Sequence, residues 1–124
     1  MQTLLAIAVF GALGCLLRYG VSRGVHLLFG YAFPYGTLMV NLIGAFLIGL
    51  IMEFSLRSAV MPSFLRVGLI VGFLGGLTTF SAFSYETFRL LEEGKLLFAG
   101  VNVLGSVTLC LVCTWLGIIA ARAI

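Results

Sequence analysis

The sequence has little of what most catalytic or metal sites require. It contains no aspartate, one histidine and four glutamates, and charged residues make up only 9% of its 124 residues. The glutamates lie at or near the ends of apolar segments, so no cluster of acids, bases or metal ligands is expected and no catalytic residue is assigned. The net charge of +3 is small, and the basic residues are spread along the sequence, so no basic patch that would bind nucleic acid is expected.

Cysteine is also scarce. Cys15, Cys110 and Cys113 all lie within apolar runs. Their odd number and the absence of histidine companions argue against a disulfide framework or a zinc site. We expect these cysteines to act as small packing residues.

Long apolar runs are what the sequence has in abundance. Hydrophobic residues make up 62% of the chain and the mean hydropathy is +1.24, far above a soluble domain. Residues 1–17, 24–52, 67–85 and 96–121 carry no formal charge. Because a membrane-spanning helix needs about 20 mostly apolar residues, the pattern predicts an all-α membrane protein with four transmembrane helices in a single domain, 1–124.

The first apolar run is predicted to be a membrane helix. A signal peptide carries its positive charges ahead of the apolar core, whereas Arg18 and Arg23 follow this run. The predicted helices cover residues 2–22, 34 to 53–56, 62–91 and 97–122, with connections at 24–33 and 92–95. Pro34 and Pro62 mark the starts of two of them, since proline fits the first helical turn.

The basic residues are nearly balanced across the predicted membrane. One side would carry three and the other three or four: Arg57, Arg66 and Arg122 against Arg23, Arg89 and Lys95, with Arg18 a possible fourth. Because Lys and Arg asymmetry sets orientation, this balance predicts insertion both ways up. Two oppositely inserted copies can form an antiparallel homodimer with its two-fold axis in the membrane plane. Alternatively, one charge near a helix end fixes a single topology.

Glycine is frequent, with sixteen copies. In lipid, glycine allows helices to approach closely. Gly68, Gly72 and Gly76 are four apart and predict a smooth groove on the third helix. Matching surfaces are expected from glycine pairs on the other three helices, namely Gly11 and Gly14, Gly44 and Gly49, and Gly100 and Gly105.

The third helix is predicted to break at mid-membrane. Gly75 and Gly76 lower helix propensity, and the hydroxyls of Thr78 and Thr79 can bond to the backbone. Irregular backbone at this depth is tolerated only where it is buried or lines a cavity, and its free carbonyls need a donor or a cation. If two antiparallel copies meet at the break, their carbonyl oxygens form the kind of site that suits a hard cation such as sodium.

Neutral polar residues recur at helical spacing. Thr37 and Asn41 are four apart and share a face of the second helix, where the Asn41 amide needs partners. The fourth helix carries a stripe of Asn102, Ser106, Cys110 and Thr114. Each of these sets is compatible with hydrogen bonds that only hold the bundle together.

Phe80 and Phe83 follow the predicted break and are three apart, hence on one face. The edge of an aromatic ring is electropositive, so two rings presented edge-on offer a weakly positive surface to an anion. Beside a break and opposite a buried asparagine, they form a candidate anion path.

Three segments resemble a known family. "GALGCLLRY" (11–19), "GTLMVNLIGAFLIG" (36–49) and "GFLGGLTTFSAFSYE" (72–86) are similar to the CrcB, or Fluc, fluoride channels, and the resemblance extends along the whole chain. It implies an antiparallel homodimer with two pores in the bacterial cytoplasmic (inner) membrane, and passive fluoride export that protects the cell. It also implies a structural sodium ion on the dimer axis, held by the backbone carbonyls of Gly75 and Thr78.

The same resemblance implies roles for particular side chains. The fluoride pathway would be lined by Asn41, Phe80 and Phe83, with hydroxyl groups forming a polar track beside them. The best matches for that track are Ser81, Ser106 and Thr114, and we add Thr37 because it shares the Asn41 face. Arg18 and Glu86 match charged positions that are assigned to structure or to pore-mouth electrostatics.

One position departs from the family pattern. The family usually has threonine or serine where this sequence has Ala82. The polar track therefore lacks one hydroxyl donor, and we expect slower throughput than in an Ala82→Thr variant, with selectivity retained.

Two other functions fit a chain of this size. A small multidrug-type exporter also has four helices and dual topology, but it needs a membrane-embedded carboxylate for proton exchange, and the first predicted helix has none. A non-transporting assembly subunit would use its polar residues only to join helices. Fluoride-specific, uncoupled flux would distinguish the channel from both.

Overall fold

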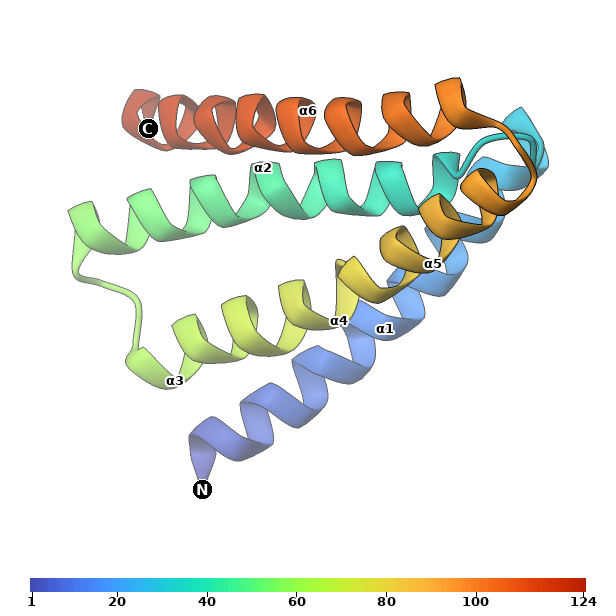
Figure 1. The fold of residues 1–124 in the computed structure, drawn as a ribbon. Helices are drawn as coiled ribbons and strands as arrows, with labels where there is room; N and C mark the ends of the chain where they lie inside the picture. The colour runs from blue at the N-terminus through green and yellow to red at the C-terminus, as the bar shows by residue number, and fades with distance from the viewer.

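The computed structural model describes all 124 residues as a bundle of helices (Figure 1). Four helices are long and apolar enough to cross a membrane, as predicted. The third of them, Ser63–Glu92, is built from four consecutive pieces. The elements are α1 (Gln2–Phe29), α2 (Tyr35–Ser58), α3 (Ser63–Val67), the π-helix η1 (Gly68–Leu74), α4 (Gly75–Leu77), α5 (Phe80–Glu92) and α6 (Leu96–Ala123).

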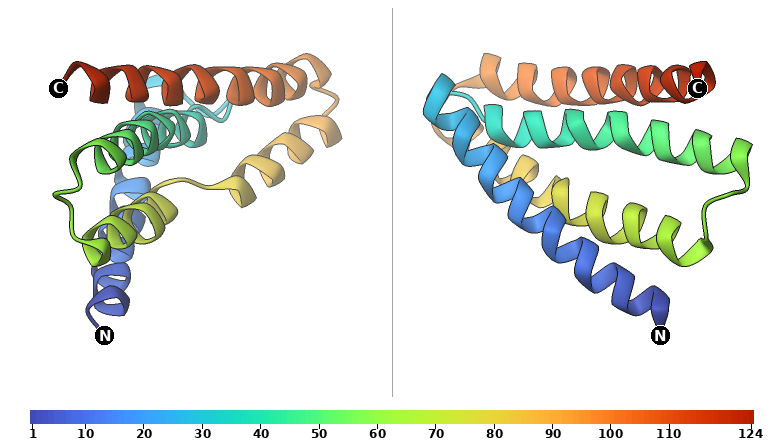
Figure 2. Two further views of the ribbon diagram at one scale, coloured as in Figure 1. Left: turned by 90° about the vertical axis from the view of Figure 1, so that its left-hand side faces the viewer. Right: turned by 180° about the vertical axis from the view of Figure 1, so that it is seen from behind.

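The helices form two packed pairs. Helices α2 and α6 lie side by side along most of their length, and α1 packs on α3, η1 and α4 (Figures 1 and 2). Beyond the break α5 turns away from α1 and runs toward the start of α6 (Figure 2). Both termini and the α2–α3 connection lie at one end of the bundle, and the other two connections lie at the opposite end (Figure 1).

Helix α1 is longer than predicted. The sequence suggested a connection at 24–33, but the helix continues through Gly24 and ends at Phe29. It is capped by Gly30, whose φ of 85° lies in the left-handed region. The N–H of Gly30 donates to the carbonyl of His26 (2.8 Å), and Nδ1 of His26 donates to the Gly30 carbonyl (3.0 Å). Gly24 keeps a helical φ and does not stop the helix, whereas Gly30 adopts a positive φ and ends it.

The break lies at the two threonines. Gly75 and Gly76 remain helical, while Thr78 (φ −87°, ψ 159°) and Thr79 (φ −152°, ψ 122°) are extended. The Thr78 hydroxyl donates to the Leu74 carbonyl (2.8 Å), and the Thr79 hydroxyl accepts the N–H of Ala82 (3.2 Å) as the N-cap of α5. The threonine hydroxyls thus satisfy backbone groups at both new helix ends. The π-helical segment just before them was not predicted.

Glycines permit the closest helix contacts, as expected for the third span. A Cβ atom at Gly72 would lie 2.8 Å from the Ile7 carbonyl oxygen, and one at Gly76 would lie 2.6 Å from that of Gly11. Glycines also permit the close α2–α6 contact, where Gly49 lies against the backbone of Thr114 and Gly117 against that of Phe46. The expectation was wrong for Gly100 and Gly105 of α6, because nothing lies within 4 Å of a Cβ atom built at either. Few side chains are fully buried in the single chain, and many large apolar ones are exposed, as suits helices surrounded by lipid.

Candidate ion pathway

The break in the third span is bridged by Asn41 of α2. The side-chain Oδ1 of Asn41 accepts the N–H of Thr79 (2.9 Å), and its Nδ2 donates to the Thr79 carbonyl (3.1 Å). Both polar groups of this extended residue are therefore satisfied without a helix. Because an amide NH₂ has two hydrogens, one N–H of Asn41 has no partner in the chain and is free to bind another acceptor.

A groove opens beside the bridge. It has a volume of about 280 Å³ and is lined by residues of α2, the break, α5 and α6. The lining residues are Asn41, Thr78, Thr79, Phe80, Phe83, Ser106, Val107 and Cys110. Four of the residues predicted for the fluoride pathway thus lie together. Val107 and Cys110 also line the groove and were not predicted for it.

The two phenylalanines pack against each other at the groove. Their ring centroids are 5.4 Å apart and the planes are tilted by 44°. Phe83 is partly buried, whereas Phe80 is 78% exposed. A large apolar ring this exposed beside a groove lies open to lipid or to a second protein surface.

A chain of buried and partly buried polar contacts joins α5 to α6. The Ser106 hydroxyl lies 3.4 Å from Oδ1 of Asn102, whose Nδ2 donates to the Thr87 hydroxyl (2.8 Å). The Thr87 hydroxyl donates in turn to the carbonyl of Phe83 (2.7 Å). Asn102 therefore positions the Phe83 segment of α5 by way of Thr87, a residue that the sequence pattern did not single out.

Thr37 does not line the groove. Its hydroxyl donates to Oε1 of Glu86 (2.7 Å), one helical turn from Asn41. The second carboxyl oxygen, Oε2, is buried and has no hydrogen-bond partner in the chain. Thr37 is thus the only side chain of the chain that donates a hydrogen bond to the Glu86 carboxyl group.

Replacing Thr37 by valine is expected to destabilise the protein by about 1–3 kcal/mol, because the buried carboxyl group of Glu86 then has no hydrogen-bond donor. Thr37→Ser keeps the hydroxyl and serves as the matched control. Thermal unfolding in detergent measures the difference. Equal stability of the valine and serine variants would show that the contact contributes nothing.

The other predicted hydroxyls lie outside the groove of the single chain. Ser81 is exposed, and its Oγ lies 3.3 Å from the Thr79 hydroxyl. Thr114 lies one turn beyond Cys110 on α6, where its carbonyl faces Gly49. Ala82 is partly buried and does not line the groove. Arg18 lines a separate hollow on α1 together with Arg23 and His26.

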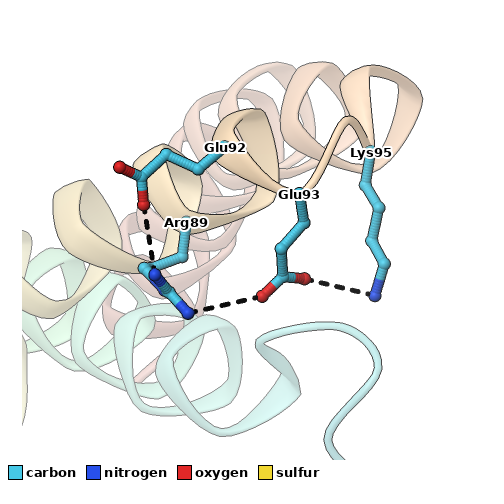
Figure 3. Close-up of polar contacts among 4 residues, drawn as sticks. All are labelled: Arg89, Glu92, Glu93 and Lys95. Carbon is cyan, nitrogen blue, oxygen red and sulfur yellow. Dashed lines mark hydrogen bonds and ion pairs between the residues drawn. The ribbon is translucent and has the colours of Figure 1, made fainter.

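Charged residues gather at one end of the bundle. Arg89 contacts Glu92 (3.2 Å) and Glu93 (3.7 Å), and Lys95 contacts Glu93 (3.4 Å), as Figure 3 shows. These side chains are about half exposed, so each pair contributes under about 1 kcal/mol to stability. A hollow of about 230 Å³ at this end is lined by Glu86 together with Arg89 and Lys95. The Glu86 carboxyl group thus shares a hollow with the positively charged side chains of Arg89 and Lys95.

Two backbone carbonyls at the break lack their usual donors. The N–H of Thr78 bonds to Leu74 and that of Thr79 bonds to Asn41, so neither reaches the carbonyl of Gly75. The carbonyl of Thr78 accepts no backbone N–H. No group of three or more His, Cys, Asp or Glu side chains converges anywhere in the chain. Hard oxygen ligands are therefore offered here by the backbone.

Comparison with known proteins identifies the family. Residues 5–118 match the model of the family described as "CrcB-like protein, Camphor Resistance (CrcB)". The chain belongs to the CrcB family. This confirms the resemblance seen in the three sequence segments. With its four spanning helices, this CrcB member is a multi-pass integral protein of the bacterial inner membrane.

Relatives match the chain from end to end. It is 70% identical over 124 residues to a protein of Geotalea uraniireducens (strain Rf4), with all of both chains covered. It is also 70% identical to a protein of Geotalea daltonii over the full length of both, and 60% identical to one of Trichlorobacter lovleyi, covering 99% of that protein. Each of these relatives bears the name "Fluoride-specific ion channel FluC".

Proposed function

We propose that this chain is a fluoride-specific ion channel that lets fluoride leave the cell passively and thereby protects it from fluoride toxicity. It is not an enzyme. The observation that carries the proposal is the groove at the break, where the Asn41 amide and the Phe80 and Phe83 rings meet at mid-span. Full-length relatives at 60–70% identity with the name of such a channel support it.

Selectivity for fluoride over chloride would follow from how the groove replaces the hydration shell of the ion. Fluoride is small and strongly hydrated, so a selective path must supply donors at close range, while a wide aqueous hole would pass chloride as well. The remaining N–H of Asn41 is one donor. Ser106 supplies a second, since its 3.4 Å contact to Asn102 is long and its hydroxyl proton can turn toward an anion. The ring edges add weak positive poles.

The helix ends at the break add partial charges of both signs. The first turn of α5 has N–H groups without intrahelical partners, and this positive end of the helix lies beside the groove. The last carbonyls of α4 form a negative end on the other side of the same break. An anion is favoured at the α5 end and a cation at the α4 end.

Fluoride efflux from proteoliposomes tests the proposal. We expect rapid fluoride release that needs no proton gradient, measured with a fluoride electrode. A small multidrug-type exporter would need such a gradient, and an assembly subunit would give no flux. Either of those results would overturn the proposed function.

Phe80→Ile is expected to lower fluoride efflux about tenfold or more, because the aliphatic side chain fills similar space without an electropositive edge. The matched control is Phe88→Ile, which alters an exposed ring on α5 that does not line the groove. Efflux rates per protein are compared in the same vesicle preparation. If both variants conduct like the parent, the Phe80 ring is not part of the path.

The working unit is proposed to be an antiparallel homodimer embedded in lipid. A single chain leaves the groove open on one side and Phe80 largely exposed, so a second copy would complete the wall. The end of the bundle with the termini carries Arg57, Arg66 and Arg122, against four basic residues toward the other end, which gives little preference for one orientation.

Orientation-biased variants test the dimer. Ser58→Lys with Ser63→Lys favours one orientation, and Ala32→Lys with Leu97→Lys favours the other. We expect each double variant to be nearly inactive alone and to regain fluoride efflux when the two are produced together. Full activity of either one alone would exclude an obligatory antiparallel pair.

A structural sodium ion is proposed at the α4 end of the break. The carbonyls of Gly75 and Thr78 fit such an ion, because they are hard oxygen ligands without N–H donors in the chain. Two carbonyls from one chain are too few, so a second copy would have to supply the rest. The ion would add positive potential near the fluoride path and hold the broken helices together.

Removal of sodium is expected to abolish most fluoride efflux. Protein purified in N-methylglucamine buffers should regain activity as sodium is added, and lithium or potassium at equal ionic strength serves as the control. Activity that is the same with and without sodium would exclude the site.

A further inference from the structure

Helix α6 carries two thiols that the proposed ion path does not use. Cys110 and Cys113 are three residues apart, both are partly buried, and neither forms a disulfide. Residues three apart share a helix face, and this one continues the buried stripe that includes Ser106 and Gly117. Cys110 itself lines the groove. Cys110 therefore lies in the wall of the groove, and Cys113 lies about one helical turn farther along the same face of α6.

The spacing favours a bridging ion over a disulfide. Side chains three apart on a helix have Cβ atoms about 5–6 Å apart. A disulfide requires about 3.5–4.5 Å between these atoms, so it would distort the helix. Two sulfurs joined through a metal ion lie farther apart than two bonded sulfurs, and an undistorted helix can supply that separation.

The ligand set selects the kind of ion. Zinc in structural sites is held by four ligands, and no group of three or more His, Cys, Asp or Glu side chains converges in this chain. Thiolates prefer soft metals such as Cu(I). Two thiolates with no third ligand suit a soft monovalent cation that accepts linear two-coordination, namely Cu(I) or Ag(I).

We propose that Cys110 and Cys113 form a binding site for such a cation, reached through the groove. On binding, each thiol loses its proton to solvent and each sulfur forms one bond to the metal. Two neutral thiols and one cation become a complex with a net charge of −1. No oxidation or reduction takes place.

The bound complex would oppose anion passage, a consequence that rests on the proposed channel function. A net negative charge in the groove wall repels fluoride, and the low dielectric of the span strengthens the repulsion. We expect at least about a tenfold lower fluoride efflux when the site is filled. The chain would then be a fluoride channel that is inhibited by soft metal ions.

Silver binding tests the site independently of transport. Cys15→Ser, which removes the exposed thiol on α1, serves as the background. The purified protein is loaded with Ag⁺ in chloride-free nitrate buffer, washed with a monothiol competitor, and assayed for silver by elemental analysis. We expect about one silver ion per chain in the background, and almost none after adding Cys110→Ser or Cys113→Ser. Equal retention by either serine variant would overturn the site.

Fluoride efflux measured on the same preparations tests whether the bound metal inhibits the channel. Silver should slow fluoride efflux of the Cys15→Ser background and leave the Cys113→Ser form unaffected after the competitor wash. Retained silver with unchanged efflux would overturn the placement of the site at the ion path. If the protein conducts no fluoride even without silver, the proposed function fails, while the silver stoichiometry still decides whether the thiol pair binds.

Discussion

Replacing Asn41 by aspartate is expected to lower fluoride efflux on the order of 10³-fold. The carboxylate still accepts the N–H of Thr79, but it cannot donate to the Thr79 carbonyl, and it places a negative charge on the groove wall. Two like charges about 4 Å apart repel by about 4 kcal/mol at an effective dielectric constant near 20, which corresponds to roughly three powers of ten in rate.

A second variant, Asn41→Leu, distinguishes the effect of the added charge on flux from the effect of the lost hydrogen bonds. It adds no charge but leaves both polar groups of Thr79 without partners, at about 1–3 kcal/mol each. We expect the leucine variant to lose more thermal stability, because it loses both hydrogen bonds to Thr79 and the aspartate variant loses only one, and we expect the aspartate variant to lose more flux. Efflux rates and unfolding in detergent are measured on both. Parental flux in Asn41→Asp would contradict the placement of the amide in the path.

Gly72→Val is expected to prevent stable folding. A Cβ atom at Gly72 would lie 2.8 Å from the Ile7 carbonyl oxygen and 3.1 Å from the N atom of Gly11, both of which are backbone atoms of α1. Backbone cannot move aside as a flexible side chain can, so overpacking should cost more than about 3 kcal/mol. Loss of a monodisperse elution peak and a much lower unfolding temperature are the expected readouts.

Gly100→Val on α6 is the matched control, because no atom lies within 4 Å of a Cβ built at Gly100. The same substitution there should fold and conduct. A Gly72→Val protein as stable as the control would show that α1 does not pack on η1 as described.

Hydropathy and proline placement predicted the four spans because both act locally. The end of α1 was missed because the stretch 24–33 contains two glycines, either of which could end the helix, and only the positive φ of Gly30 shows which one does. The break was predicted from a glycine pair and two threonines, yet only the threonines leave the helix. Glycine permits irregular backbone, whereas hydroxyl caps stabilise it.

The candidate site was partly visible in the sequence. The Asn41, Phe80 and Phe83 pattern indicated the groove, because helical spacing placed the amide and both rings beside the same predicted break. Pairings between distant residues were not visible, because periodicity describes one helix at a time. Thr37 with Glu86 and Thr87 with Asn102 are two such pairs, 49 and 15 residues apart.

Ser81 and Thr114 show the limit of transferring roles from a resemblance. Neither lines the groove of the single chain. Their part in the fluoride path remains a prediction, which a structure of the proposed dimer would test.

Fluoride and chloride efflux, measured side by side from the same vesicles, decides whether the groove at the break is a fluoride-selective path. If fluoride passes the narrow groove at the break, where the Asn41 amide, the Ser106 hydroxyl and the ring edges replace its hydration shell, it should leave at least about a hundred times faster than chloride. Equal rates for the two ions would mean that they cross by a wide aqueous route, and the account of the groove as a selective path would be wrong.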